Sequence, residues 1–221
     1  MPAPHSPVDR AALSAALVSA VPAGVAALLG RRRTAAALLT VPTGVVAFFR
    51  DPARRPDREV LDPDVVVAPA DGKVMYAGKA QPEVAPPGDW QQVSIFLSLF
   101  DVHINRAPYR GRVESVTYRP GKWHAAYKFE SATENERSEI TLVDEVDGRE
   151  RRLVFRQIVG LVARRVVTRV VPGDVLATGQ RIGLMKFGSR MDVFVPLDVD
   201  VVAVEGDPTL AGESVIARWP S

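Results

Sequence analysis

The chain has 221 residues, enough for one good-sized core with an appendage, and carries a formal net charge of only +2. So small a charge gives no indication of a nucleic-acid partner. The absence of cysteine excludes disulfides, thiolate nucleophiles and cysteine-ligated zinc sites, and with three histidines, His5, His103 and His124, we expect no metal site.

Two uncharged, alanine-rich stretches lie near the start of the chain, at residues 11–30 and 34–49, and three arginines at 31–33 separate them. As a helix, the first stretch is long enough to cross the hydrocarbon core of a bilayer, whereas the second is shorter than the usual ~20 residues. Two full spans would place the arginine triplet opposite the arginines that follow residue 49, against the positive-inside tendency. We therefore expect one span or a shallow re-entrant hairpin. The alternative is a pair of buried helices in a soluble protein.

A polar connector with several prolines follows, and it contains Arg50, Arg54, Arg55 and Arg58. We expect residues 1–59 to be a helical membrane anchor with this basic connector, and residues 60–221 to form the folded domain, at the cytoplasmic face of the cell membrane. The arginines would hold that domain against anionic lipid, at about 1 kcal/mol each near the surface. A cleaved secretory signal is not expected, because charged residues follow the first apolar run instead of preceding it.

From about residue 65 onward the chain consists of short runs that are rich in β-branched residues and bounded by Gly, Pro and Asp. The runs lie at residues 65–68, 73–77, 92–97, 112–118, 139–146, 152–159, 166–171, 183–186, 191–195 and 200–204. Many short strands without alternating helices are typical of a mainly β sandwich or barrel. Residues 122–137 interrupt the pattern and predict a long loop or short helix, in which Asn135-Glu136-Arg137 would be solvated.

Two turn-rich units, around the Asp71-Gly72 turn and at residues 171–180, indicate a more particular architecture. The pair resembles the barrel-sandwich layout of biotinyl and lipoyl carrier domains, in which a lysine at a hairpin tip carries the prosthetic group. Leu184-Met185-Lys186 resembles that tip, so one functional hypothesis is a membrane-tethered carrier module modified at Lys186. The β region is much longer than a carrier domain, which argues against this hypothesis.

The Gly188-Ser189 pair, flanked by strand-like runs, suggests a different chemistry. A serine hydroxyl can attack the preceding carbonyl, and glycine at that position leaves room for the attack. Backbone strain would favour a shift from amide to ester, and β-elimination with hydrolysis would then leave a pyruvoyl group at residue 189. Such a ketone forms a Schiff base with an amine and accepts the electrons of decarboxylation. The alternative is an ordinary Gly-Ser turn.

Other side chains could assist such a centre. His103, which the pattern places at a strand end, could act as a general acid or base. Asp71 could orient this histidine, or it could simply cap its own turn. Lys186 and Arg190 would place positive charge beside an anionic substrate, and His124 is a further candidate for substrate binding.

Six motifs occur in the order that is seen in one family of enzymes. They are residues 48–52 (Phe-Phe-Arg-Asp-Pro), 68–72 (Ala-Pro-Ala-Asp-Gly), 101–108 (Asp-Val-His-Ile-Asn-Arg-Ala-Pro), 135–137 (Asn-Glu-Arg), 160–165 (Gly-Leu-Val-Ala-Arg-Arg) and 186–190 (Lys-Phe-Gly-Ser-Arg). With these motifs the chain resembles the phosphatidylserine decarboxylase proenzymes of the short bacterial and archaeal type. Because the motifs span most of the chain, together they are far more specific than any one of them.

The resemblance implies self-cleavage between Gly188 and Ser189 into a β chain of residues 1–188 and an α chain of residues 189–221. The two would stay together as a heterodimer, with a higher oligomer left open. Ser189 would become the covalent pyruvoyl cofactor, with His103 and Asp71 as catalytic residues, and phosphatidylserine in membrane lipid would be decarboxylated to phosphatidylethanolamine. The alternative is a pyruvoyl-dependent decarboxylase of another amino-acid-bearing substrate, although a soluble substrate gives no reason for the apolar N-terminal stretches.

One position departs from the longer members of the family, which carry a second histidine three residues after the first in this loop. Here that position is Arg106. In the longer members the second histidine is assigned, with an aspartate and the serine, to a self-processing triad, so the triad cannot be carried over whole. Either His103 serves both processing and decarboxylation, or processing relies on Asp71 and backbone strain.

Overall fold

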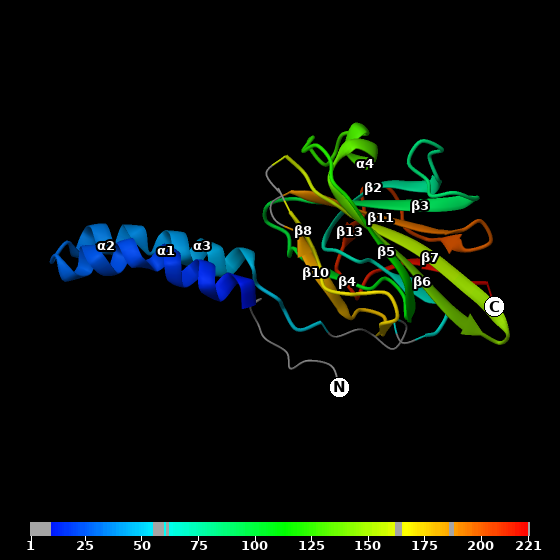
Figure 1. Ribbon diagram of the computed structural model, residues 1–221, viewed down its shortest axis with the longest axis horizontal. Coiled ribbons are helices and arrows are strands. Elements are labelled where there is room, and N and C mark those ends of the chain that lie inside the picture. Colours follow the sequence, from blue (N-terminus) through cyan, green and yellow to red (C-terminus); the bar gives the residue numbers. More distant parts are fainter. Residues whose placement is uncertain (1–9, 55–59, 61, 162–164, 186–187, 221) are drawn as a thin grey trace. The chain divides into compact units, whose positions relative to one another are not determined.

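The computed structural model describes residues 10–54, 60, 62–161, 165–185 and 188–220. The chain forms two compact units, residues 1–53 and 54–221, and each is described by itself (Figure 1). In chain order the elements are α1 (Arg10–Leu28), α2 (Arg32–Leu38), α3 (Thr40–Phe48), β1 (Val65–Val67), β2 (Gly72–Lys79), β3 (Trp90–Leu97), β4 (Ile104–Arg106), β5 (Gly111–Arg119), α4 (Glu130–Glu134), β6 (Arg137–Val146), β7 (Arg149–Ile158), β8 (Val166–Thr168), β9 (Val175–Leu176), β10 (Arg181–Met185), β11 (Ser189–Pro196), β12 (Asp200–Val201), β13 (Pro208–Thr209) and β14 (Val215–Arg218).

The first unit is helical, because its long uncharged stretches are rich in alanine and leucine, which favour helix. Helix α1 accommodates Pro22 and packs against both α2 and α3. Many large apolar side chains of this unit are exposed, among them Val18, Leu28 and Leu29. Within the residues described, no helix has the combination of length and apolar character that crossing a membrane requires.

The second unit is mainly β, and its barrel-sandwich-like architecture confirms the prediction from the strand pattern. A large antiparallel sheet with the strand order β13-β2-β3-β11-β7-β6-β5-β9 curls into a half-barrel. Two smaller sheets, β1-β14-β12 and β4-β10-β8, complete the domain. The runs of Val, Ile and Thr form these strands because branched side chains pack well on a pleated, half-buried surface.

Strand β11 lies in the middle of the large sheet and is buried on both faces. Met191 and Val193 belong to the main apolar cluster of the domain, whereas Phe194 packs with Ala132 of α4 in a second cluster. Successive side chains of a strand point to opposite faces of the sheet. Ser189 therefore shares the face of Met191 and Val193.

The Gly188-Ser189 bond lies at one end of the large sheet. Ser189 pairs with Leu97, the last residue of β3, and Arg190 pairs with Ile158, the last residue of β7. In an antiparallel arrangement, the two neighbours of β11 end where β11 begins. The loops that follow β3 and β7, together with the loop before β6, therefore surround the start of β11.

The loop before β6 contains the short helix α4, in line with the predicted long loop or short helix at residues 122–137. The expectation that residues 135–137 are solvated is wrong. Asn135 is fully buried, and Glu136 is almost fully buried. The reason is that the amide of Asn135 binds backbone groups inside the loop, which sequence alone does not indicate.

Candidate functional site

The hydroxyl of Ser189 is a buried polar group without a hydrogen-bond partner. The residue is completely inaccessible to solvent, and within the described part of the chain no donor or acceptor binds its Oγ. Leaving a buried polar atom unpaired costs roughly 1–3 kcal/mol. Such groups are uncommon in folded proteins and are often retained for a catalytic role.

Gly188, the residue before Ser189, has a left-handed backbone conformation with φ 62°. A Cβ built on it would meet nothing within 4 Å outside its chain neighbours. The requirement for glycine here is therefore conformational, because L side chains are disfavoured at this φ. The scissile bond predicted from sequence thus begins at a backbone position that is strained for most other residues.

His103 contacts the same bond from a distant part of the chain. Its Nε2 accepts a hydrogen bond of 3.2 Å from the backbone N–H of Gly188, and its Nδ1 lies 2.8 Å from the carbonyl oxygen of Asp101. Because a carbonyl oxygen can only accept, Nδ1 carries the proton and Nε2 presents its lone pair. His103 is buried, and its Nε2 lone pair is directed at the N–H of Gly188, one residue before the hydroxyl that a general base would deprotonate.

Gly160 packs directly against the carbonyl of Gly188. A Cβ built on Gly160 would lie 1.9 Å from the oxygen of that carbonyl and 2.9 Å from its carbon. The other side of Gly160 faces Ala126, whose Cβ would be 3.2 Å from the added atom. No residue larger than glycine fits here without moving backbone, so Gly160 allows the two segments to pack this closely.

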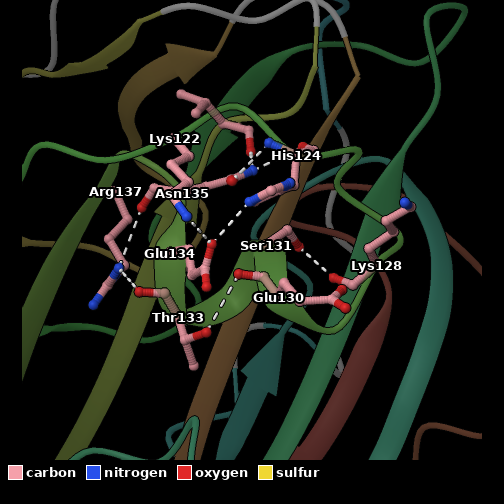
Figure 2. A network of polar contacts seen from close by, with 10 residues as sticks. Lys122, His124, Lys128, Glu130, Ser131, Thr133, Glu134, Asn135 and Arg137 are labelled. Carbon is pink, nitrogen blue, oxygen red and sulfur yellow. Dashed lines mark hydrogen bonds and ion pairs between the residues drawn. The ribbon is translucent and has the colours of Figure 1, made fainter.

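Asn135 joins the residue before Gly160 to the loop that contains His124. Its Nδ2 donates hydrogen bonds of 2.8 Å to the carbonyls of Val159 and His124, and its Oδ1 accepts one of 2.8 Å from the N–H of His124. Figure 2 shows the amide lying between these segments of the loop. One buried side chain thus ties the residue before Gly160 to the loop that covers it.

The outer part of this loop carries an ion-pair network (Figure 2). Lys122 Nζ and His124 Nε2 each lie 2.9 Å from the same carboxylate oxygen of Glu134. Lys122 and, to a lesser extent, His124 lower the pKa of Glu134, because their donated hydrogen bonds and positive charge stabilise the carboxylate. The imidazole of His124 is therefore engaged at the partly exposed edge of the loop.

Comparisons with known proteins identify the family. The family model described as phosphatidylserine decarboxylase matches residues 43–217. The chain belongs to the phosphatidylserine decarboxylase family. Similar proteins include three phosphatidylserine decarboxylase proenzymes. That of Pelobacter propionicus is 44% identical over 209 residues, 94% of this chain and 87% of the relative. That of Salinibacter ruber is 42% identical over 188 residues, covering 83% and 81% of the two chains. That of Solibacter usitatus is 41% identical over 203 residues, covering 92% of each.

Membership of this family confirms the resemblance seen in the six motifs. It makes the chain a decarboxylase, that is, a lyase of phospholipid biosynthesis. Because the relatives are proenzymes, membership also implies that the chain processes itself.

Asp71, the predicted partner of His103, is engaged by other groups. Its two carboxylate oxygens lie 2.6 and 2.7 Å from Nη2 of Arg54, and one of them also accepts a 2.8 Å hydrogen bond from the N–H of Ala211. Asp71 is buried, and a hydrogen bond between a guanidinium and a carboxylate is among the stronger charge-assisted contacts. Asp71 therefore joins Arg54 of the basic connector to the loop before β14.

Arg190 and Lys186 were predicted to contact an anionic substrate. Arg190 is buried, and its Nε lies 2.6 Å from Asp192 Oδ1 while its Nη2 donates to Ser94 Oγ at 3.1 Å. It points to the face of β11 opposite Ser189, so its charge is balanced inside the protein. Lys186 lies outside the described residues.

Arg106 occupies the position of the second histidine in the longer decarboxylases. Its Nη1 donates a hydrogen bond of 3.0 Å to the carbonyl of Gly179. Its Cδ packs against Gly212, since a Cβ built on Gly212 would lie 3.2 Å from that Cδ. The side chain is buried against these two turns. An arginine cannot be deprotonated at neutral pH, so Arg106 cannot replace a histidine as a base.

Two residues with a place in this site had no predicted role, although both belong to the family motifs. Gly160 lies against the scissile carbonyl, and Asn135 anchors the segment that contains Gly160. Their presence in the motifs at residues 135–137 and 160–165 was the only indication of a role that the sequence offered. Neither residue is reactive, and only their contacts across the fold give them a function.

We expect Asn135→Ala to lower the free energy of unfolding by about 2–4 kcal/mol, because it leaves three backbone groups without partners at roughly 1–3 kcal/mol for each one that stays dry. Urea unfolding in the uncut Ser189→Ala chain measures this without interference from cleavage. Asn135→Asp should lose at least as much, because a carboxylate oxygen in place of Nδ2 cannot donate to the carbonyls of Val159 and His124. Equal stability of the alanine variant and its parent would contradict the anchoring role.

Proposed function

We propose that this protein is a pyruvoyl-dependent decarboxylase that cleaves itself between Gly188 and Ser189 and then converts phosphatidylserine to phosphatidylethanolamine. The observation that carries the proposal is the buried, unpaired Oγ of Ser189, next to a glycine in left-handed conformation whose N–H binds His103 Nε2. Family membership supports the substrate. A nucleophile, an electrophile in a left-handed backbone conformation and a candidate base thus occur close together in one buried place.

Self-cleavage begins with attack of Ser189 Oγ on the carbonyl carbon of Gly188. His103 Nε2 takes the hydroxyl proton and delivers it to the departing amide nitrogen, so an ester replaces the amide without net proton change. In the β-elimination that follows, His103 Nε2, which has given up its first proton, takes the Cα proton of residue 189 while the Cβ–Oγ bond of the ester breaks. This releases the carboxylate of Gly188 and leaves dehydroalanine at residue 189. Hydrolysis adds one water and releases one ammonia, leaving a pyruvoyl end. Gly160 would hold the Gly188 carbonyl in place during the attack.

Once formed, the pyruvoyl group supplies a carbonyl that condenses with the substrate amine and takes up the electrons of the broken carboxylate bond. The residues of the chain then have two tasks. They exclude water from residue 189, which is fully buried in the main core face of β11. His103 would protonate the substrate carbon that loses carbon dioxide, since its Nε2 lies beside Gly188.

His103 rather than Asp71 is therefore proposed as the base of self-cleavage. We expect His103→Gln to slow self-cleavage by about 10²- to 10⁴-fold, the usual contribution of a general base. The fraction of uncut chain over time on a denaturing gel measures it. His124→Gln is the matched control, because that imidazole binds Glu134 at the edge of the loop, and it should cleave at the native rate. Native-rate cleavage of His103→Gln would assign the base elsewhere.

The two products are proposed to remain one folded heterodimer. The smaller product would start with β11, which lies between β3 and β7 of the larger one, and its β13 and β14 pair with β2 and β1. Separating them would expose the central strand of the large sheet and much of the apolar core. Cleavage just before Ser189, the first residue of β11, would leave all of these pairings intact.

We also propose that the helical unit attaches the enzyme to the cytoplasmic face of the cell membrane. Exposed apolar side chains such as Val18, Leu28 and Leu29 support contact with lipid. The adjacent arginines at residues 31–33 support an anionic, cytoplasmic surface. A lipid substrate gives such attachment a purpose, because a diacyl chain does not leave the bilayer readily.

Intact mass under denaturing conditions tests the proposal. We expect two chains, residues 1–188 and 189–221, the smaller lighter by one ammonia than a peptide that starts with serine. Release of labelled carbon dioxide from carboxyl-labelled phosphatidylserine, and none from free serine, would establish the substrate. A single chain of full mass would overturn the proposal, and an added mass on Lys186 would favour a carrier module. Decarboxylation of a soluble amino acid alone would favour the other class of pyruvoyl enzyme.

A further inference from the structure

Large apolar side chains are exposed around the start of β11. We call Leu99, Phe100, Trp123, Tyr127, Phe129 and Leu161 the site rim. Phe100 is 85% exposed and Leu161 is 65% exposed. Apolar side chains exposed one at a time need no explanation, but several gathered at one place mark an interaction surface.

Strand pairing brings the rim residues to one place. Leu99 and Phe100 follow β3, whose last residue pairs with Ser189. Leu161 follows Gly160, which touches the carbonyl of Gly188. The remaining three belong to the loop that covers Gly160, and the ring of Tyr127 packs edge-on against Phe96 of β3, with 6.1 Å between ring centroids. The rim therefore surrounds the candidate active site.

One part of the rim is joined directly to the catalytic histidine. Phe100 lies in the turn formed by residues 98–101, which is closed by hydrogen bonds between Ser98 and Asp101. The carbonyl oxygen of Asp101 accepts a hydrogen bond from the Nδ1–H of His103. A partner that contacts Phe100 therefore contacts the turn whose Asp101 carbonyl binds His103.

The composition of this surface points to a lipid partner. The most exposed aromatic side chains described are Phe100, Tyr118, Trp123, Tyr127 and Phe129, and all five lie at the site end of the large sheet. The opposite end exposes the aliphatic Val175 and Leu197. Tryptophan and tyrosine concentrate at membrane interfaces, because they combine an apolar body with a polar tip.

The charges beside the rim do not favour a highly charged macromolecule. Lys122 is paired with Glu134, and the neighbouring Lys128 and Glu130 have opposite signs. These four charges balance, so burial of apolar area would be the main source of affinity at this part of the rim. In a bilayer interface the exposed aromatic side chains of the rim would become buried.

We propose that the site rim inserts into the bilayer interface, so that the active site meets the phosphatidylserine headgroup without extracting the lipid. This inference rests on the proposed lipid decarboxylase activity and assigns its membrane-facing surface. The turn at residues 98–101 would place Phe100 in the bilayer interface, and its Asp101 carbonyl binds His103. The reaction would therefore take place at the depth of the lipid headgroups.

A pair of substrates separates the rim from the chemistry. We expect Phe100→Ser combined with Leu161→Ser to lower the rate on phosphatidylserine in phosphatidylcholine vesicles at least tenfold. The rate on short-chain phosphatidylserine dissolved as monomers should be unchanged, because no bilayer is involved. Both replaced side chains are largely exposed, so folding and self-cleavage should be normal. Val175→Ser with Leu197→Ser is the matched control and should keep both rates.

Fluorescence gives an independent measurement on the same full chain. Vesicles of phosphatidylcholine with brominated acyl chains should quench part of the tryptophan emission, and Trp123→Phe should abolish that part. Absence of quenching from Trp123, or equal losses on vesicles and monomers in the rim variant, would overturn the inference. If the rim variant instead changes a native dimer to a monomer in sedimentation equilibrium, a second copy covers the rim. Native enzyme inactive on both substrates would refute the proposed function itself.

Discussion

We expect the Ser189→Ala chain to stay in one piece, whereas the native chain divides after Gly188. Without Oγ there is no nucleophile for the Gly188 carbonyl, and no elimination can follow. The intact mass should equal that of the uncut chain, and decarboxylation should be undetectable, a loss of many orders of magnitude. Because the Oγ of Ser189 has no hydrogen-bond partner in the described structure, its removal should not destabilise the fold, and it could raise the free energy of unfolding.

Ser138 provides a matched control for this substitution. It is a buried serine of the same large sheet, and its Oγ is likewise without a partner among the described residues. Ser138→Ala should cleave normally, because β7 lies between its strand, β6, and β11. Division of the Ser189→Ala chain after residue 188 would show that an external protease makes the cut, and the self-cleavage mechanism would fail.

The second large effect is expected from a residue with no reactive group. Gly160→Ala should slow self-cleavage by about 10²-fold or more, because the new Cβ would lie 1.9 Å from the scissile carbonyl oxygen and the backbone must shift. Displacing a reacting group by about 1 Å commonly costs 10²-fold in rate. The fraction of uncut chain over time measures the change.

Gly111→Ala separates this positional effect from general strain. Its Cβ would lie 2.7 Å from the carbonyl oxygen of Val143, at the other end of the same sheet. That variant should lose stability and still cleave at close to the native rate. Hydroxylamine, which cuts esters, should not accelerate cleavage of Gly160→Ala, because the block precedes ester formation. Cleavage of Gly160→Ala at the native rate would show that Gly160 does not position the carbonyl.

Sequence alone predicted the class of the domain, which the structure confirms, and a chemistry for its centre, which stays a prediction. Short runs of β-branched residues bounded by turn residues predict strands wherever they occur, since strand preference is largely a matter of local pattern. The Gly188-Ser189 pair indicated its reaction because nucleophile and electrophile are adjacent in the chain. The order of six motifs identified the family, which the comparisons confirmed.

The partners of that centre were decided by the tertiary structure. His103 and Gly188 are 85 residues apart, and only the pairing of β10 with β4 and of β11 with β3 brings them together. The same holds for Asn135, which looks like a loop residue in sequence and is buried because its amide replaces missing backbone partners. Arg190 was expected to face the substrate, but strand alternation directs it to the opposite face from Ser189.

The site rim and Gly160 illustrate the same physical limit. Each rim side chain is an unremarkable apolar residue in its own loop, and their common location follows from where β3, β7 and β11 begin and end. Sequence therefore determined what reacts, because reactivity belongs to residue types and their neighbours in the chain. The fold determined what holds and surrounds the reacting bond, because strand register and loop packing join segments that carry no local record of one another.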